Sequence, residues 1–300
     1  MKNKNSKKIF FGILFLLLAL ILGVVAWNFD FILSLVHAYQ NGSLTVERIR
    51  FDIAAFDLGQ TLTVVPVAVQ TSPPDGMTQV YVPEGKFIMG KGPQSQDKDS
   101  PAHVVYLDAF WMDQVEVTNA MYEKCVKAGG GSLPTINFNP YYGRWVYRDY
   151  PVVYVTWFQA DQYCQWSGRR LPTEAEWEKA ARGSDRRTYP WGDALPNPRL
   201  ANFDLGLRGE AASSYRYPLG ASPYGVFNMA GNVREWIADW FTPDYYRNSP
   251  AENPKGPASG TERSLRSGSY NEDQKEIAVY RRYSHFPQSP GLSRGFRCAQ

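Results

Sequence analysis

The sequence predicts an α+β domain that is irregular and rich in ordered loops. Three observations lead to this fold class: a few short strand-like runs, three helical segments with polar caps at their starts, and long connecting stretches of Gly, Pro, Asn and aromatic residues. The 300 residues are 44% hydrophobic and 15% aromatic, which is enough to bury a full core. We therefore expect one large domain after the N-terminal region, without internal repeats.

Strand signals dominate the first part of that domain. Residues 80–90 are typical of a strand, a turn and a second strand, and residues 104–112 predict one further strand. Residues 62–69 also alternate like a strand, but turn and breaker residues follow at 72–77. We accordingly place the start of the domain at Gln79 and interpret residues 30–78 as a stalk or linker.

The first predicted helix covers residues 119 to about 127. Thr118 supplies an N-cap oxygen, and the run of glycines from Gly129 ends the helix. Cys125 lies on this helix, where a small buried residue is the expectation rather than a reactive thiol.

Two more helices are predicted at residues 157–166 and 174–182. Thr156 with Gln159 forms the capping box of the first, and Thr173 with Glu176 forms that of the second. The second helix also carries Glu174 and Glu178, and an acidic first turn is explained by capping and by the helix dipole without invoking acid/base catalysis. After residue 183 the periodicity largely stops, so we expect loops over the following region.

The N-terminus predicts a membrane anchor. Residues 9–29 are uncharged and almost wholly apolar, which is long enough to cross a hydrocarbon core of roughly 30 Å. Lysines in residues 1–8 and Asp30 after the apolar run predict a cytoplasmic tail and an extracytoplasmic domain, hence a single-pass membrane protein. A cleaved signal peptide is the alternative, because residues 24–26 could serve as its cleavage site.

Charge and histidine content exclude several function classes. The formal net charge is +3 from 32 basic and 29 acidic residues, and four of the lysines lie in the first eight residues, so nothing favours a nucleic-acid partner. Three scattered histidines, His37, His103 and His285, form neither a zinc motif nor a convincing general base. The three cysteines allow one disulfide and one leftover thiol in an exported domain.

Three runs in the second half carry a family resemblance. They are Gly-Arg-Arg-Leu-Pro-Thr-Glu-Ala-Glu-Trp-Glu at 168–178, Asn-Met-Ala-Gly-Asn-Val-Arg-Glu-Trp at 228–236 and Gly-Phe-Arg-Cys at 295–298. Together they resemble the formylglycine-generating enzyme, or sulfatase-modifying factor, family over residues 79–300. The resemblance implies that family's irregular, C-type-lectin-like fold and a disulfide between Cys164 and Cys298, which would leave Cys125 unpaired.

The resemblance also implies structural Ca²⁺. In the first expected site, the side chains of Asn228 and Glu235 and the backbone carbonyls of Gly231 and Val233 would be the ligands, which are oxygen donors of the kind that Ca²⁺ takes.

A second Ca²⁺ site would begin at Asn202 and Phe203. Its later acidic ligand has no clear match in the sequence, because the following loop is shorter than in the family.

Activity is where the sequence departs from the family. The family binds Cu(I) with two cysteines shortly after a Gly-Ser-Tyr turn and oxidises a substrate cysteine to formylglycine. Ser269 and Tyr270 belong to such a turn, but residues 271–280 contain no thiol, so bound copper is not expected. We therefore predict a pseudoenzyme whose pocket near Trp236, Ser269 and Tyr270 binds a peptide, a protein segment or a small ligand.

Two catalytic alternatives stay open. One is a formylglycine-generating oxidase whose copper site is built otherwise, with Cys125 as a ligand. The other is an iron-dependent sulfoxide synthase, a branch of the family that needs a histidine triad, which the three scattered histidines do not match.

Overall fold

The fold is described from a computed structural model, which covers residues 68–92, 99, 101–135 and 139–300. Within these residues no helix is long and apolar enough to span a bilayer. The expected tail at 1–8, the expected anchor at 9–29 and most of the expected stalk at 30–78 lie outside the described residues.

The strands of the first half form two small antiparallel sheets. β1 (Val69–Thr71), β2 (Thr78–Val82) and β5 (Phe110–Asp113) make one sheet in the order β1-β2-β5. β3 (Gly85–Met89) and β4 (His103–Leu107) make the other. Because β1 pairs with β2, the sheet begins ahead of the start that we placed at Gln79.

The single strand expected at residues 104–112 is wrong, because the chain breaks there into β4 and β5. Asp108 stands at the break. Its backbone N–H donates to Asn253 Oδ1 at 2.9 Å, and its carboxylate accepts from Asn253 Nδ2 at 3.0 Å. These contacts with a distant loop end β4, so the next strand can pair in a different sheet.

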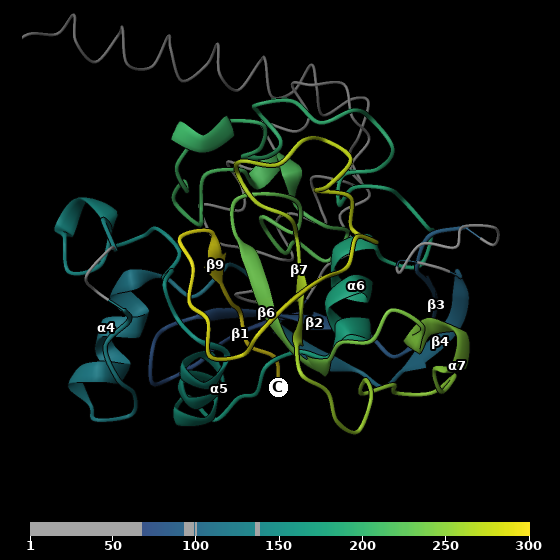
Figure 1. Cartoon of the computed structure of the whole chain (residues 1–300), viewed down its shortest axis with the longest axis horizontal. Helices are drawn as coiled ribbons and strands as arrows, with labels where there is room; N and C mark the ends of the chain where they lie inside the picture. Colours follow the sequence, from purple (N-terminus) through teal and green to yellow (C-terminus); the bar gives the residue numbers. More distant parts are fainter. Residues whose placement is uncertain (1–67, 93–98, 100, 136–138) are drawn as a thin grey trace, which may run out of the picture. The chain divides into compact units, whose positions relative to one another are not determined.

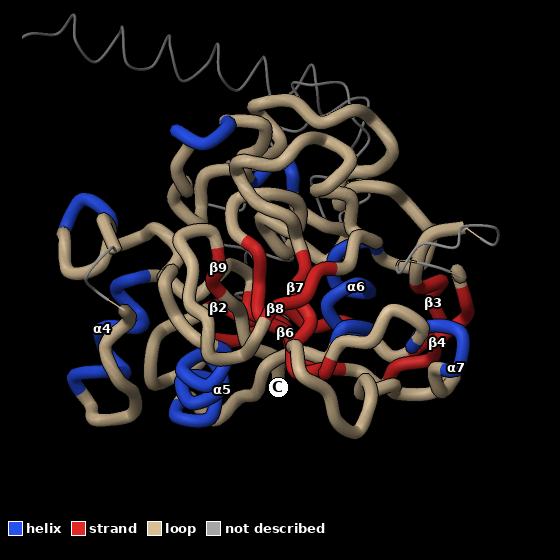
Figure 2. The backbone as a smooth tube through the Cα atoms, viewed as in Figure 1, coloured by secondary structure: helices blue, strands red, loops and turns tan. Residues whose placement is uncertain are grey.

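All three predicted long helices are confirmed. They are α4 (Asn119–Lys127), α5 (Trp157–Trp166) and α6 (Glu174–Arg182), and the reciprocal capping boxes of α5 and α6 both form. A short helix α7 (Tyr245–Asn248) and three 3-10 turns, η2 (Trp145–Tyr147), η3 (Gly206–Arg208) and η4 (Pro218–Gly220), were not predicted. Residues 184–233, which hold η3 and η4, are otherwise loop, as expected, whereas the loop expectation is wrong from residue 234 on, where strands follow (Figure 2).

The third sheet comes from the C-terminal third of the chain. It has the order β8-β7-β6-β9, built from β6 (Arg234–Trp240), β7 (Arg263–Arg266), β8 (Tyr283–His285) and β9 (Arg294–Gly295). β9 pairs parallel with β6 and the other pairs are antiparallel. Helices α5 and α6 both contact this sheet at β6 (Figure 1). The strand β6 therefore lies against the two helices whose capping boxes the sequence predicts.

The predicted disulfide is confirmed. Cys164 on α5 is bonded to Cys298 near the C-terminus, with the two Cα atoms 5.6 Å apart. Both cysteines are fully buried in the core cluster that also holds Tyr163 and Phe296. Cys125 is the free cysteine and is buried in the same cluster, as expected for a small core residue.

Candidate functional site

Two buried carboxylates and one arginine form the centre of the site. Glu116 follows β5, Glu235 lies on β6, and Arg297 precedes the bridged Cys298; all three are fully buried. Arg297 donates from Nε to Glu235 Oε2 and from Nη2 to Glu235 Oε1, both at 2.7 Å. Trp177 of α6 adds an indole N–H bond to Glu235 Oε2 at 2.8 Å. Both oxygens of Glu235 are therefore already in use.

Glu116 is held by amides instead of by a guanidinium. Asn228 Nδ2 and Asn232 Nδ2 each donate to one of its carboxylate oxygens, at 2.8 Å. Burial raises the pKa of Glu116 to about 7; the nearby Arg297 opposes this rise and Glu235 adds to it. Two carboxylates thus face one fixed positive charge in a space closed to solvent.

A left-handed turn brings the Asn228 segment to this point. Asn228 and Asn232 both have positive φ, at +57° and +61°, which Asn tolerates better than most residues. Gly231, at φ +85°, lies so close to the backbone of Asn202 that a Cβ atom there would be 2.4 Å from the Asn202 carbonyl oxygen. The Asn and Gly residues of the motif are thus required by backbone geometry.

The expected first Ca²⁺ site fits these residues in part. Asn228 Oδ1 is buried and has no hydrogen-bond partner, although its Nδ2 is doubly bonded, so a hard cation would satisfy an orphaned oxygen. The surplus of carboxylate over guanidinium charge favours a cation as well. Against this, Glu235 is ion-paired with Arg297 and the carbonyl oxygen of Gly231 accepts from Ser267 Oγ at 2.9 Å.

The second expected Ca²⁺ site lies beside the first. Asn232 joins them, because its N–H donates to the Asn202 carbonyl at 2.8 Å and its Oδ1 accepts from Asn202 Nδ2 at 3.0 Å. Asn202 Nδ2 also donates to the carbonyl of Glu210 at 3.0 Å. Glu210 is an exposed acidic residue of the same loop, and its backbone carbonyl is the group that contacts Asn202. The turn η3, followed by Gly209, lies in the short loop that connects Asn202 and Glu210.

The interval that lacks cysteines is filled by ion pairs. Ser269 Oγ donates to Glu272 Oε2 at 2.9 Å, and Arg234 Nε donates to the same oxygen at 3.1 Å, with a second, very short bond from Nη2 to Oε1. The Arg234 guanidinium also lies 4.1 Å from the ring centre of Tyr283. A residue of the 228–236 motif is thus paired with a residue of the thiol-free interval.

A second set of charges continues from there. Glu276 accepts two bonds from Arg281 Nη2, at 2.6 and 2.8 Å, and one from the Tyr283 hydroxyl at 2.7 Å. Arg281 Nη1 bonds Asp99 as well. Carboxylates and guanidinium groups are hard, charged partners for one another, and none of them is a soft ligand for Cu(I).

The three residues expected to line a ligand pocket are all buried. Trp236 is fully buried and donates its indole N–H to the Val155 carbonyl at 3.0 Å, whereas Ser269 and Tyr270 are 1% and 3% exposed. Tyr270 packs with Tyr141 in a different core cluster from that of Trp236. The structure therefore does not bring these side chains together on an accessible surface.

The remaining candidate metal ligands are separated. His103 lies on β4 and His285 on β8, which belong to different sheets. Cys125 lies on α4, and burial, helped by the charge of Asp75, raises the pKa of its thiol to about 11. Among the described residues no group of three or more His, Cys, Asp or Glu side chains is arranged to hold a metal ion.

Comparison with known proteins gives one family. The model of the sulfatase-modifying factor enzyme 1-like domain matches residues 66–300. A formylglycine-generating enzyme of Streptomyces coelicolor is 35% identical over 282 residues, covering 74% of this chain and 88% of that enzyme. The hercynine oxygenase of Mycolicibacterium smegmatis is 36% identical and covers 64% of this chain and 54% of that protein.

Two further similarities concern a kinase and a solved structure. The serine/threonine-protein kinase pkn1 of Chlamydia caviae is 34% identical over 74% of this chain, and this chain matches only 37% of that kinase's length. The structure of PvdO from Pseudomonas aeruginosa superimposes with a TM-score of 0.66 at 23% identity, covering 77% of this chain and 97% of PvdO. At that identity the likeness establishes the fold alone.

Proposed function

The chain belongs to the family of sulfatase-modifying factor enzyme 1-like domains, and from this premise we propose that it is a non-catalytic binding domain of that family, anchored in a membrane. Its ligand would be a peptide, a protein segment or a small molecule. The proposal that this domain, unlike its formylglycine-generating relatives, is non-catalytic rests on the cysteines of this chain.

The observation that supports the proposal most strongly is the small number of cysteines available to bind copper. The whole sequence has three cysteines, and Cys164 and Cys298 are joined in a disulfide. A Cu(I) site of the family type needs two thiolates, whereas only Cys125 is left, buried on α4 with a raised pKa. Glu272 and Glu276, which stand in the thiol-free interval, are bound to arginines.

An activity assay tests this proposal. The full chain in detergent is incubated with Cu(I), O₂ and a peptide containing Cys-x-Pro-x-Arg, with the Streptomyces coelicolor enzyme as positive control. Mass spectrometry then follows the conversion of cysteine to formylglycine. We expect no conversion by this chain; copper-dependent turnover would overturn the proposal and establish the oxidase alternative.

The hercynine oxygenase relative suggests a second chemistry, which the described residues favour less. An iron site of that branch would need three convergent histidines. His103 and His285 lie on strands of different sheets, and the third histidine of the sequence, His37, precedes the family match.

The membrane anchor at residues 9–29 is part of the same proposal and has its own test. We expect the full chain to stay with the membrane fraction after extraction with alkaline carbonate, and its N-terminal sequence to begin near Met1. Release into the supernatant, with a new N-terminus near residue 27, would favour the signal-peptide alternative.

Structural Ca²⁺ is also proposed, at Asn228 and Glu235. The orphaned Asn228 Oδ1 supports it most directly, with Gly231 and Val233 as the carbonyl donors and Glu210 beside the second position at Asn202. The ion would neutralise the surplus carboxylate charge and tie the loop to β6.

Melting curves measured in Ca²⁺ and in chelator test the calcium proposal. Ca²⁺ should raise the melting temperature of the parent chain, because a ligand of the native state stabilises it by mass action. Glu235→Gln should shrink that calcium-dependent difference, whereas Glu123→Gln, on the exposed side of α4, should keep it. Identical curves with and without Ca²⁺ in the parent chain would contradict the site.

A further inference from the structure

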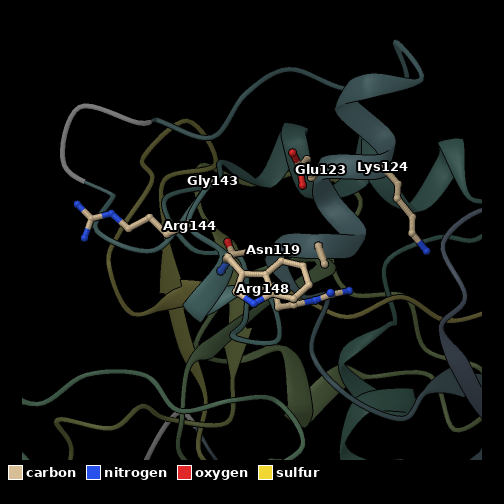
Figure 3. Close-up of a pocket in the computed structure, with 8 residues that line it drawn as sticks. Asn119, Glu123, Lys124, Gly143, Arg144 and Arg148 are labelled. Atoms are coloured by element: carbon tan, nitrogen blue, oxygen red, sulfur yellow. The ribbon is translucent and has the colours of Figure 1, made fainter.

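A pocket lies between the first turns of α4 and the 3-10 turn η2, apart from the buried residues described above. Its volume is about 390 Å³. Helix α4 contributes Asn119, Glu123 and Lys124, and the η2 segment contributes Arg144, Trp145 and Arg148. Figure 3 shows Asn119 and Arg148 near the centre of this group, with Arg144 and Lys124 at opposite ends.

The η2 side of the pocket presents unusually exposed apolar surface. Trp145 is 76% exposed and Val146 is 73% exposed. The Arg148 guanidinium lies 4.4 Å from the ring centre of Trp145, so the two side chains form one cation–π unit. Trp and Arg are the residues most often found at the energetic centre of protein interfaces.

Positive charge at the pocket is only partly compensated. Arg144 has no ion pair within the described part of the chain, and Arg148 has only a long contact with Asp149, at 3.5 Å between exposed groups. The acid on the α4 side, Glu123, is already paired with Lys127 at 2.8 Å. An anionic group would therefore find two available guanidinium groups here.

Asn119 supplies a second, independent sign of a missing ligand. Its side chain is 4% exposed, and its Nδ2 donates to the Tyr147 carbonyl at 2.9 Å. Its Oδ1 is buried without a hydrogen-bond partner, although it belongs to a residue that lines the pocket. An unpaired buried acceptor is unfavourable, so a donor that reaches it gains a bond without breaking one.

We propose that this pocket binds an acidic segment of a partner protein. Carboxylates of the segment pair with Arg144 and Arg148, an apolar side chain packs on Trp145, and an N–H of the segment donates to Asn119 Oδ1. The inference rests on the binding function proposed above and names its surface and its ligand class. Protruding side chains of a peptide can fill a concave pocket of this volume. A flat bilayer surface has no protruding group of that kind.

Peptide titration tests the ligand class. The full chain in detergent is titrated into fluorescein-labelled Gly-Glu-Phe-Glu-Gly and into its neutral counterpart Gly-Gln-Phe-Gln-Gly, with anisotropy as the readout. We expect the acidic peptide to bind at least about tenfold more tightly, and its affinity to fall as salt is added, since exposed charge pairs are screened. Equal affinity of the two peptides would overturn the proposal.

Substitutions then locate the site. Arg144→Gln and Arg148→Gln should each weaken binding of the acidic peptide by about tenfold, as expected for loss of a charge-assisted hydrogen bond. Trp145→Ala should weaken both peptides. Arg208→Gln and Leu207→Ala are the matched controls. They remove an exposed arginine and a 98% exposed leucine on η3, which does not line the pocket, and should leave the affinity for both peptides unchanged.

The remaining outcomes separate this inference from the proposed function. Unchanged binding in all three pocket variants would overturn the pocket but leave the binding domain standing. Sedimentation with phosphatidylserine vesicles that depends on Trp145, without peptide binding, would replace the peptide by a lipid surface and overturn the proposal. Copper-dependent turnover with intact peptide binding would overturn the proposed function and leave the pocket in place.

Discussion

Two buried ionic clusters in this core are charged in opposite ways. The first, the α6 cluster, joins Glu174 and Glu178 of α6 to Arg182, Arg266 and Arg282, with contacts from 2.5 to 3.2 Å. Guanidinium groups outnumber carboxylates in it. Burial alone would raise the pKa of Glu174, but Arg282 and Arg266 outweigh burial and hold that pKa below its usual value.

The second, the Arg169 cluster, has the opposite imbalance, because Arg169 serves two aspartates. Arg169 Nη1 lies 2.6 Å from Asp113 Oδ1, and its Nη2 bonds Asp75. Neutral donors supply the rest: the Tyr163 hydroxyl donates to Asp75 at 2.7 Å and the Cys298 N–H donates to Asp113 at 2.8 Å. Burial, only partly offset by Arg169, raises the pKa of Asp113 to about 6. The pKa of a buried carboxylate in this core is thus set by the donors that the fold places around it.

The largest effect should come from breaking the α6 cluster. Glu174→Ala leaves Arg266 and Arg282 with one carboxylate fewer in a dry site, which should cost about 3–5 kcal/mol of unfolding free energy. Denaturant unfolding measures the loss. Glu123→Ala, which removes an exposed carboxylate, is the control and should cost less than about 1 kcal/mol. Equal losses in the two variants would show that the cluster stabilises little.

The Arg169 cluster should be weakened next by removing its disulfide. Replacing Cys164 and Cys298 together by serine frees the segment around residue 298, whose N–H donates to Asp113, and should cost about 2–4 kcal/mol. In the parent chain, alkylation of the unfolded, non-reduced protein should label Cys125 alone. Labelling at Cys164 under those conditions would contradict the bridge.

A single neutral donor should matter less. Tyr163→Phe removes the hydroxyl that bonds Asp75 and should cost about 1.5 kcal/mol, the usual scale for a hydrogen bond to a charged group. Tyr81→Phe changes a more exposed tyrosine and serves as the control. If Tyr163→Phe costs no more unfolding free energy than Tyr81→Phe, Arg169 alone is enough to compensate the buried charge of Asp75.

The two clusters should also give pH slopes of opposite sign. Glu174 has a lowered pKa, so its contribution to stability is present above its ordinary pKa of 4.5 and is lost as the pH falls through its folded value. Asp113 has a raised pKa, so the native state holds its proton more tightly and stability falls as the pH rises from 3.8 to about 6.

Unfolding free energies measured from pH 6 down to acidic pH well below 4.5 check both signs. Asp113→Asn should remove the loss of stability on raising the pH, and Glu174→Gln should remove the loss on lowering it. A parent slope that neither variant alters would show that other groups dominate the titration.

Local pattern predicted the helices, and remote contacts explain what it missed. The capping box of α6 could be read from Thr173 and Glu176, but Glu174 and Glu178 were interpreted as an acidic first turn explained by capping and the helix dipole. Their partners Arg266 and Arg282 lie 88 to 108 residues away, and no spacing rule links them.

The candidate site was likewise predicted where its residues belong to a sequence motif and missed where they do not. Motifs and resemblance gave Asn228, Glu235 and Asn202, because those residues stand at fixed places in the runs. Glu116 was missed, although an acid between the buried Val115 and Val117 is itself a signal of a carboxylate that the fold must compensate. Burial of Trp236 and Tyr270 depends on packing that the sequence alone does not show.

The segment at residues 298–300 has a consequence for how this domain is made. Its backbone pairs with Trp111 and Asp113 of β5 and with Arg170, and its cysteine closes a loop of 134 residues in sequence separation. During vectorial synthesis the thiol of Cys164 has no native partner until Cys298, 134 residues later in the sequence, has been made, while Cys125 is present on the adjoining helix α4. Cys125 is the one other cysteine of the sequence, so a Cys125–Cys164 bridge formed in that interval would have to be exchanged before the native bridge could form.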